Sequence, residues 1–320
     1  MHSVAQPWMW GAFLVFVLVM LSLDIFAFGG NKAQKMGVRQ AAYWSLAWVC
    51  MAMLFAAGMW AYLNKVTGAE IAHTKAMEFL AGYVIEKALS IDNIFVFLLI
   101  FNHFSVPAEH QRKVLLYGVL GAIVMRIAMI LGGVWVVEQF SWVLYGFGAF
   151  LIFTGLKMIR TADNEEDLEA NPIVRWAKTH LSFTDGFRAE KFSVVENGRR
   201  LWTPLLLVLV MIEVSDVVFA VDSIPAIFAI TTDPFIVFTS NIFAIMGLRA
   251  LYFLLADIAD RFHYLKYGLA LVLIFVGGKM LVVDWFHIST LISLLVIGVI
   301  VAGSVVISLL IKKHGPAQIN

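Results

Sequence analysis

Residues 203–230 read TPLLLVLVMIEVSDVVFAVDSIPAIFAI, an apolar run interrupted by the carboxylates of Glu213, Asp216 and Asp222. About 20 apolar residues are enough for a helix to cross the hydrocarbon core of a bilayer. Ionisable residues are rare in such helices and usually mark a functional site. The segment therefore predicts a membrane helix that carries a polar site.

The composition of the whole chain extends this prediction. Of the 320 residues, 61% are hydrophobic and only 14% are charged, a balance that excludes an ordinary soluble fold. Lys plus Arg number 23 against 22 Asp plus Glu, so charge indicates no nucleic-acid partner. The single Cys50 excludes a disulfide framework and a thiolate metal cluster. The composition predicts an all-α polytopic membrane protein whose main partner is the lipid bilayer.

Apolar segments of spanning length recur along the chain and predict about nine transmembrane helices. We expect a transmembrane domain over 1–312, with an inner loop at about 161–202 and a tail at 313–320. The predicted spans are 8–28, 41–63, 77–102, 114–137, 141–160, 203–230, 235–256, 265–284 and 288–311.

Basic residues orient these spans, because Lys and Arg are retained on the cytoplasmic side. With the N-terminus outside, 17 of them fall in inner segments, two fall outside and four lie within spans. This asymmetry predicts an external N-terminus and a cytoplasmic C-terminus. The first span is expected to be an uncleaved helix rather than a signal peptide, since no Lys or Arg precedes it.

The inner loop contains two local features. Its acidic run, Asp163 to Glu169, is interpreted as a solvated linker. Residues 192–202, FSVVENGRRLW, indicate either a β-hairpin around Asn197-Gly198 or an irregular connector. Neither feature suggests chemistry.

A sequence repeat relates spans three to five to spans six to eight. The segment IFTGLKM at 152–158 corresponds to IFVGGKM at 274–280, and Tyr145-Gly146 corresponds to Tyr267-Gly268. Polar residues match in the same order, namely Glu86 with Asp216, Asp92 with Asp222 and Arg126 with Arg249. Three-helix units joined in tandem have opposite orientations, which predicts an inverted repeat with a binding site near the midplane.

Five acids fall within spans three and six: Glu86, Asp92, Glu213, Asp216 and Asp222. Left ionised and unpaired, they would cost about 12 kcal/mol or more on insertion scales. A bound cation, a proton or a basic partner must offset that cost. Lys87, Arg126 and Arg249 are candidate partners, but five acids against three bases favour a bound cation.

The spacing of the acids suggests how such a site is built. Six residues leave the members of a pair about 120° apart on a continuous helix, so unwinding near Pro225 would help them face one cavity. A simple kink at Pro225 is the alternative. Oxygen ligands suit Mg²⁺, Ca²⁺ or Mn²⁺ better than Zn²⁺, and a proton pathway is also open. Uncharged oxygen ligands are available from Ser90, Asn93 and Ser223.

Three further polar residues are weaker candidates. Asp24 is interpreted as a proton or ion relay or as an interfacial residue, and Asn241 as a cavity-lining or a packing residue. Lys87 is a candidate relay as well as a charge partner. Arg126 and Arg249 either hold the empty acidic site together or form structural pairs.

Two motifs carry a family resemblance over about residues 8–312. The segments EKALSIDN at 86–93 and EVSDVVFAVDSIPA at 213–226 resemble the signature segments of the TerC family of integral membrane proteins. The resemblance implies a bacterial inner-membrane protein that exports Mn²⁺ from the cytoplasm. It assigns transport to the five acids and adds Asn93 and Ser223 as adjacent members.

The leading hypothesis is therefore a divalent-metal exporter with no resident cofactor and no catalytic residues, driven by proton antiport. An intramembrane hydrolase with paired aspartates is a competing class, although five acids suit a cation better than one acid–base dyad. A membrane-bound redox or stress modulator, linked to tellurite resistance through the family name, is the remaining alternative. Ion selectivity and oligomeric state stay open.

Overall fold

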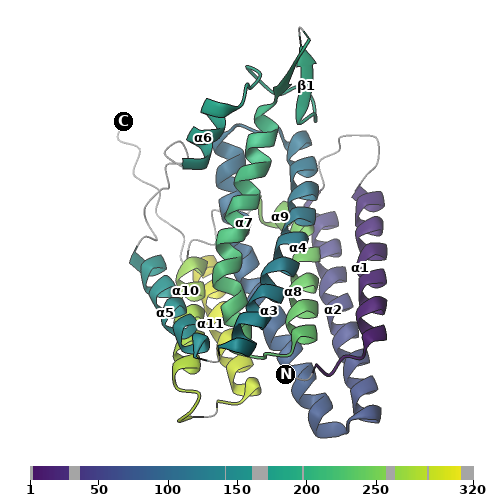
Figure 1. The fold of residues 1–320 in the computed structure, drawn as a ribbon, viewed down its shortest axis with the longest axis vertical. Helices are drawn as coiled ribbons and strands as arrows, with labels where there is room; N and C mark the ends of the chain where they lie inside the picture. Colours follow the sequence, from purple (N-terminus) through teal and green to yellow (C-terminus); the bar gives the residue numbers. More distant parts are fainter. Residues whose placement is uncertain are drawn as a thin grey trace.

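The computed structural model describes residues 3–28, 37–140, 142–160, 172–196, 198–256, 264–286 and 288–310. It is a bundle of helices with one small hairpin at one end (Figure 1). The first half of the chain contributes α1 (Pro7–Phe28), α2 (Val38–Val66), α3 (Ala69–His103), α4 (Ala108–Gln139) and α5 (Val143–Arg160). The second half contributes α6 (Pro172–His180), β1 (Ser193–Glu196), β2 (Arg199–Trp202), α7 (Pro204–Phe228), α8 (Pro234–Met246), α9 (Leu248–Ala256), α10 (Leu265–Leu281) and α11 (Thr290–Leu310).

The predicted apolar segments all fall on helices, which confirms an all-helical membrane protein. Within the described residues, five helices are long and apolar enough to cross a bilayer: α2, α4, α5, α7 and α11. A sixth crossing arises if α8 and α9, which meet at a bend of 40°, count as one span. The nine crossings predicted from the sequence therefore exceed what helix length and composition establish, because α3 is interrupted by charges, α10 has only 17 residues, and α1 counts only as a shorter apolar helix over Pro7–Leu23.

The helix breaks do not lie where the sequence analysis placed them. Helix α7 stays continuous through Pro225, which lies in its last turn, and α3 stays continuous through Glu86 and Asp92. The bent segment is instead the α8–α9 pair, where Gly247 ends α8. Pro225 removes only one backbone hydrogen bond, the one to the Val221 carbonyl, and the helix continues to Phe228.

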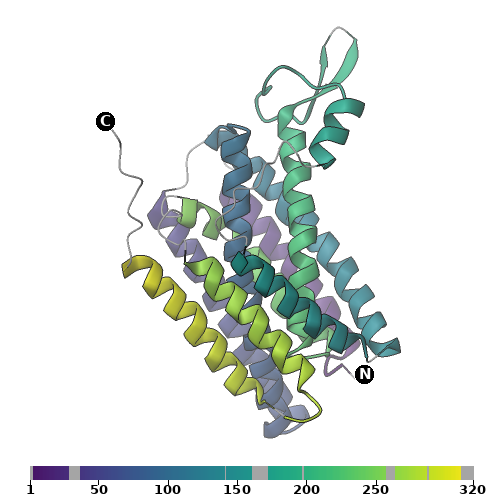
Figure 2. The same ribbon diagram turned by 90° about the vertical axis from the view of Figure 1, so that its left-hand side faces the viewer.

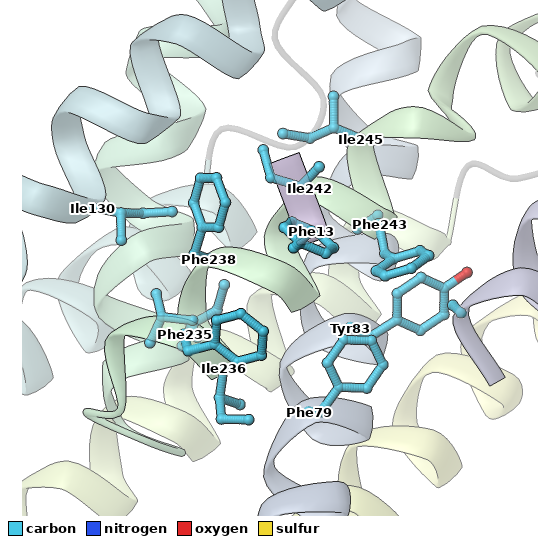
Figure 3. Close-up of a cluster of buried hydrophobic side chains, with 14 of the residues drawn as sticks. Phe13, Phe79, Tyr83, Ile130, Phe235, Ile236, Phe238, Ile242, Phe243 and Ile245 are labelled. Carbon is cyan, nitrogen blue, oxygen red and sulfur yellow. The ribbon is translucent and has the colours of Figure 1, made fainter. Parts of the chain in front are cut away.

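Helix α8 is the central element of the bundle. Every residue from Phe235 to Met246 is buried, and a helix that is apolar on all sides is expected inside a protein. Its Phe243 ring lies 5.8 Å from Phe13 of α1 and 5.9 Å from Phe79 of α3, measured between ring centroids (Figure 3). Aromatic packing thus surrounds α8 and fixes its depth between the other helices.

Both ends of the bundle are tied by polar contacts. At the start of α8, the Asp233 carboxylate caps the helix by accepting from Phe235 N at 3.1 Å, and it also accepts from Ser3 Oγ and from Val4 N. At the opposite end, Lys113 Nζ of α4 donates to the Glu190 carbonyl at 2.7 Å, which anchors the loop before the hairpin.

The inner loop contains the hairpin that the Asn-Gly turn predicted. Strands β1 and β2 pair antiparallel, with Glu196 opposite Arg199, and Gly198 in the turn has a φ of 74°. Helix α6 was not foreseen. The acidic run 163–169 and the tail 313–320 lie outside the described residues.

Helices α5 and α10 form the closest helix pair, and α11 lies beside α10 (Figure 2). A Cβ at Gly155 would lie 2.7 Å from the Ala270 carbonyl oxygen, and one at Gly277 would lie 2.5 Å from the Gly148 carbonyl oxygen. Positions 148 and 270, like 155 and 277, are 122 apart, the offset that relates Tyr145 to Tyr267. Exchanging the two repeats therefore converts each contact into the other.

The same exchange holds for a second pair of contacts. A Cβ at Gly155 would lie 2.8 Å from Ile274 Cγ1, and one at Gly277 would lie 2.9 Å from Ile152 Cγ1. Ile152 and Ile274 are again 122 positions apart. The antiparallel α5–α10 pair thus has local two-fold symmetry.

Gly277→Ala tests this close approach. The added methyl group would meet the Gly148 carbonyl at 2.5 Å, so we expect the free energy of unfolding to fall by about 1–3 kcal/mol. Thermal unfolding in detergent, followed by circular dichroism, measures the change. Gly278→Ala is the matched control, because its Cβ would meet nothing within 4 Å. Equal effects of the two substitutions would contradict the predicted contact.

Candidate functional site

A guanidinium group forms the centre of the polar interior. Arg126 is 0% exposed, and its Nη1 donates to the Glu86 carboxylate, to Asn241 Oδ1 at 2.8 Å and to Ser223 Oγ at 3.3 Å. Its Nη2 donates to Asp216 Oδ1 at 3.3 Å. We call these five residues the Arg126 cluster.

Four helices contribute to the Arg126 cluster. Glu86 belongs to α3, Arg126 to α4, Asp216 and Ser223 to α7, and Asn241 to the central helix α8. Asp216 and Ser223 are seven residues apart, which places them on one face of a continuous helix. The cluster therefore joins both halves of the sequence repeat at one buried point.

The cluster itself holds more acidic than basic groups and leaves some hydrogen-bonding atoms unused. Two carboxylates, Glu86 and Asp216, face one guanidinium. Asp216 Oδ2 and Arg126 Nε are buried without a hydrogen-bond partner, and so is Ser90 Oγ, one turn from Glu86 on α3. Buried polar atoms are normally satisfied, so these unpaired oxygens indicate unused capacity for a ligand.

The remaining acids of α7 point elsewhere. Asp222 accepts a hydrogen bond from Thr154 Oγ1 of α5 at 3.2 Å. The Glu213 carboxylate lies against Gly121 of α4 and does not join the Arg126 cluster. Because α7 does not unwind, Asp216 and Asp222 keep directions about 120° apart on the helix.

The remaining predicted residues lie on α1, α3 and α9. Asn93 on α3 and Arg249 on α9 are each 2% exposed. Lys87 Nζ donates to the Ala244 carbonyl of α8 at 3.1 Å. Asp92 lies in α3 and Asp24 in α1, but their side chains are outside what the structure describes.

The arrangement differs from a preformed metal site. Among the described side chains, His, Cys, Asp and Glu do not gather in threes at a spacing suited to one metal ion. Arg126 instead contacts both carboxylates of its cluster. A divalent cation can bridge Glu86 and Asp216 only after the guanidinium moves aside.

Thr154 is a polar neighbour that the sequence analysis missed. It was passed over as part of a repeated apolar segment, yet it differs from its counterpart, Val276. This one hydroxyl in the first repeat donates a hydrogen bond to Asp222. The difference between Thr154 and Val276 at equivalent positions of the two repeats is the sequence feature that could have indicated this hydroxyl.

Removing the central charge tests the cluster. Arg126→Leu leaves two buried carboxylates without their partner, so we expect a loss of about 3–5 kcal/mol in the free energy of unfolding. Glu86→Gln in the same chain should recover part of the loss, since it removes one uncompensated charge. A thermal-unfolding double-mutant cycle measures this coupling. Strictly additive losses would be inconsistent with the Arg126–Glu86 pair.

Comparisons with known proteins agree with the motifs. Residues 71–315 match the pattern described as "Integral membrane protein TerC family". A protein of Photorhabdus laumondii named "Putative membrane-bound redox modulator Alx" is 51% identical over 98% of each chain. Its namesake in Escherichia coli K12 is 54% identical over 94% of each.

A more distant relative also aligns over nearly the full length of the chain. An uncharacterized membrane protein of Myxococcus xanthus is 45% identical over 99% of this chain and 96% of its own. No solved structure matches. Since the family match spans most of the sequence and the relatives align over nearly the full length, the chain belongs to the TerC family of integral membrane proteins.

Proposed function

We propose that the protein exports a divalent metal ion, Mn²⁺, from the cytoplasm. The observation that supports this most is the Arg126 cluster, in which two carboxylates, an amide and a hydroxyl from three helices, α3, α7 and α8, converge on Arg126 in the interior. Oxygen donors of this kind suit hard divalent cations. The choice of Mn²⁺ among them rests on the resemblance of the two acidic motifs to the TerC family.

In this mechanism Arg126 is an internal counter-charge. Without cargo, the guanidinium pairs with both Glu86 and Asp216 and holds α3, α4 and α7 together. An arriving divalent cation replaces it at the carboxylates, where Asn241 and Ser223 add neutral oxygens. The metal ligands proposed from the motifs also include Asp92, Asn93, Glu213 and Asp222.

Proton antiport supplies a driving force for release. Protonation removes the charge of a carboxylate and so weakens its hold on a cation. Protons entering from outside would discharge the acids and expel the metal. Transport that is strictly indifferent to a pH gradient would eliminate this step.

We further propose nine membrane crossings in the bacterial inner membrane, with the N-terminus periplasmic and the C-terminus cytoplasmic. The inverted repeat is supported by the two-fold contacts between α5 and α10, since units of opposite orientation place equivalent helices antiparallel. Rocking of one repeat against the other would expose the cluster alternately to the two sides.

Redox or stress modulation without transport is the second candidate function. The name of the relatives, putative membrane-bound redox modulator Alx, is the observation that favours it. Cys50 on α2 is the sole cysteine of the chain and is exposed. A Cys50→Ser variant that loses a redox phenotype while cellular metal content stays unchanged would support this reading over export.

Mn²⁺ flux into inside-out proteoliposomes tests export directly. We expect Glu86→Gln and Asp216→Asn to lower the flux roughly tenfold or more, because each removes a charged ligand. Asp92→Asn and Asp222→Asn extend the test to acids outside the Arg126 cluster. Glu70→Gln, an exposed acid on the first turn of α3, is the matched control and should transport normally. Flux through wild type no greater than through empty liposomes would refute export.

The orientation is tested by cysteine labelling in a Cys50→Ser background. Glu70 and Glu109 lie in the first turns of α3 and α4, at opposite ends of α3. A membrane-impermeant maleimide applied to cells with a permeable outer membrane should label Glu70→Cys at once. It should label Glu109→Cys only after the inner membrane is lysed. The reverse pattern would invert the proposed topology.

A further inference from the structure

The break between α8 and α9 exposes backbone groups inside the bundle. The two helices meet at Gly247 with a 40° bend. The last carbonyls of a helix have no partner within that helix, and the peptide dipoles make this end negative. Positive charge is therefore favoured next to the end of α8.

Lys87 of α3 supplies that charge. Its Nζ donates to the Ala244 carbonyl, in the last turn of α8, at 3.1 Å. A Cβ at Gly247 would lie 2.7 Å from the same Nζ and 3.1 Å from Trp48 Cβ. The ammonium group thus rests directly against the break, and a glycine leaves room for it.

The other half of the repeat lacks both features. The correspondence of Glu86 with Asp216 places Val217 opposite Lys87, and Val217 carries no charge. The correspondence of Arg126 with Arg249 places Val124 opposite Gly247. Helix α4 runs unbroken from Ala108 to Gln139 through that position. The lysine and the helix break are therefore both present in one half of the repeat and both missing from the other.

Carbonyls at the end of a broken half-helix are the groups with which membrane transporters coordinate monovalent cations. We propose that Lys87 is a tethered cation that permanently fills such a position at the α8–α9 break. The position is a cation site of the carbonyl type, and a small monovalent cation will occupy it once the lysine charge is removed. Binding of a monovalent cation at the α8–α9 break does not depend on which ion binds at the Arg126 cluster.

The experiment measures the unfolding temperature of purified protein with a chelator present and no divalent metal, at fixed pH and ionic strength. Lys87→Gln keeps a hydrogen-bond donor but loses the charge. We expect its unfolding temperature to rise by about 3 °C or more when choline is replaced by Na⁺ or methylammonium, and to saturate with concentration. Choline is too bulky to enter. Wild type and Lys65→Ala, which removes an exposed lysine at the end of α2, should respond equally to all three cations.

Two further variants make the outcome decisive. Lys87→Arg retains a fixed charge and should show no specific cation effect, whereas Lys87→Ala should depend on the cation as Lys87→Gln does. A Lys87→Gln protein as stable as wild type in choline would overturn the proposal, because a hydrogen bond alone would then suffice. So would a failure of Lys87→Gln and Lys87→Ala to fold in every cation. Since no divalent metal is present, these results are separate from the flux assay.

Discussion

The ion pair between Arg126 and the carboxylates of Glu86 and Asp216 is the contact on which the interior depends. An unpaired charge of either sign has a large desolvation cost inside a membrane protein, and the pairing of the guanidinium with the carboxylates offsets this cost for both. The pair also has a geometric effect. It requires α3, α4 and α7 to meet at one depth, around a central helix that is buried on every side.

Apolar runs and turn residues were sufficient to predict the long helices and the hairpin, because both depend on local properties. The apolar runs define the helices, and Asn197-Gly198 defines the turn between β1 and β2. The acids of the Arg126 cluster were also predicted, since a carboxylate in an apolar run is conspicuous. For Arg126 the sequence left two roles open, holding the empty acidic site together or forming a structural pair. Its position at the centre of the cluster follows from the packing of the helices.

The errors concern long-range geometry. The sequence contains Pro225 and suggests an unwound α7, but the bend occurs at Gly247, whose sequence neighbours are ordinary apolar residues. The role of Gly247 depends on a lysine 160 positions earlier in the chain, and only folding brings the two together. Likewise the separation of Asp216 from Asp222 follows from a helix that remains regular, which local propensity does not decide.

The glycine contacts between α5 and α10 have a consequence for how such a chain can arise. A contact that maps onto itself under a two-fold rotation needs no covalent link between its halves. Two copies of one short three-helix protein, inserted in opposite directions, would form the same interface as a homodimer. Fusion of two such genes would then free each copy to diverge, and Thr154 against Val276 is a difference of the kind that such divergence would produce.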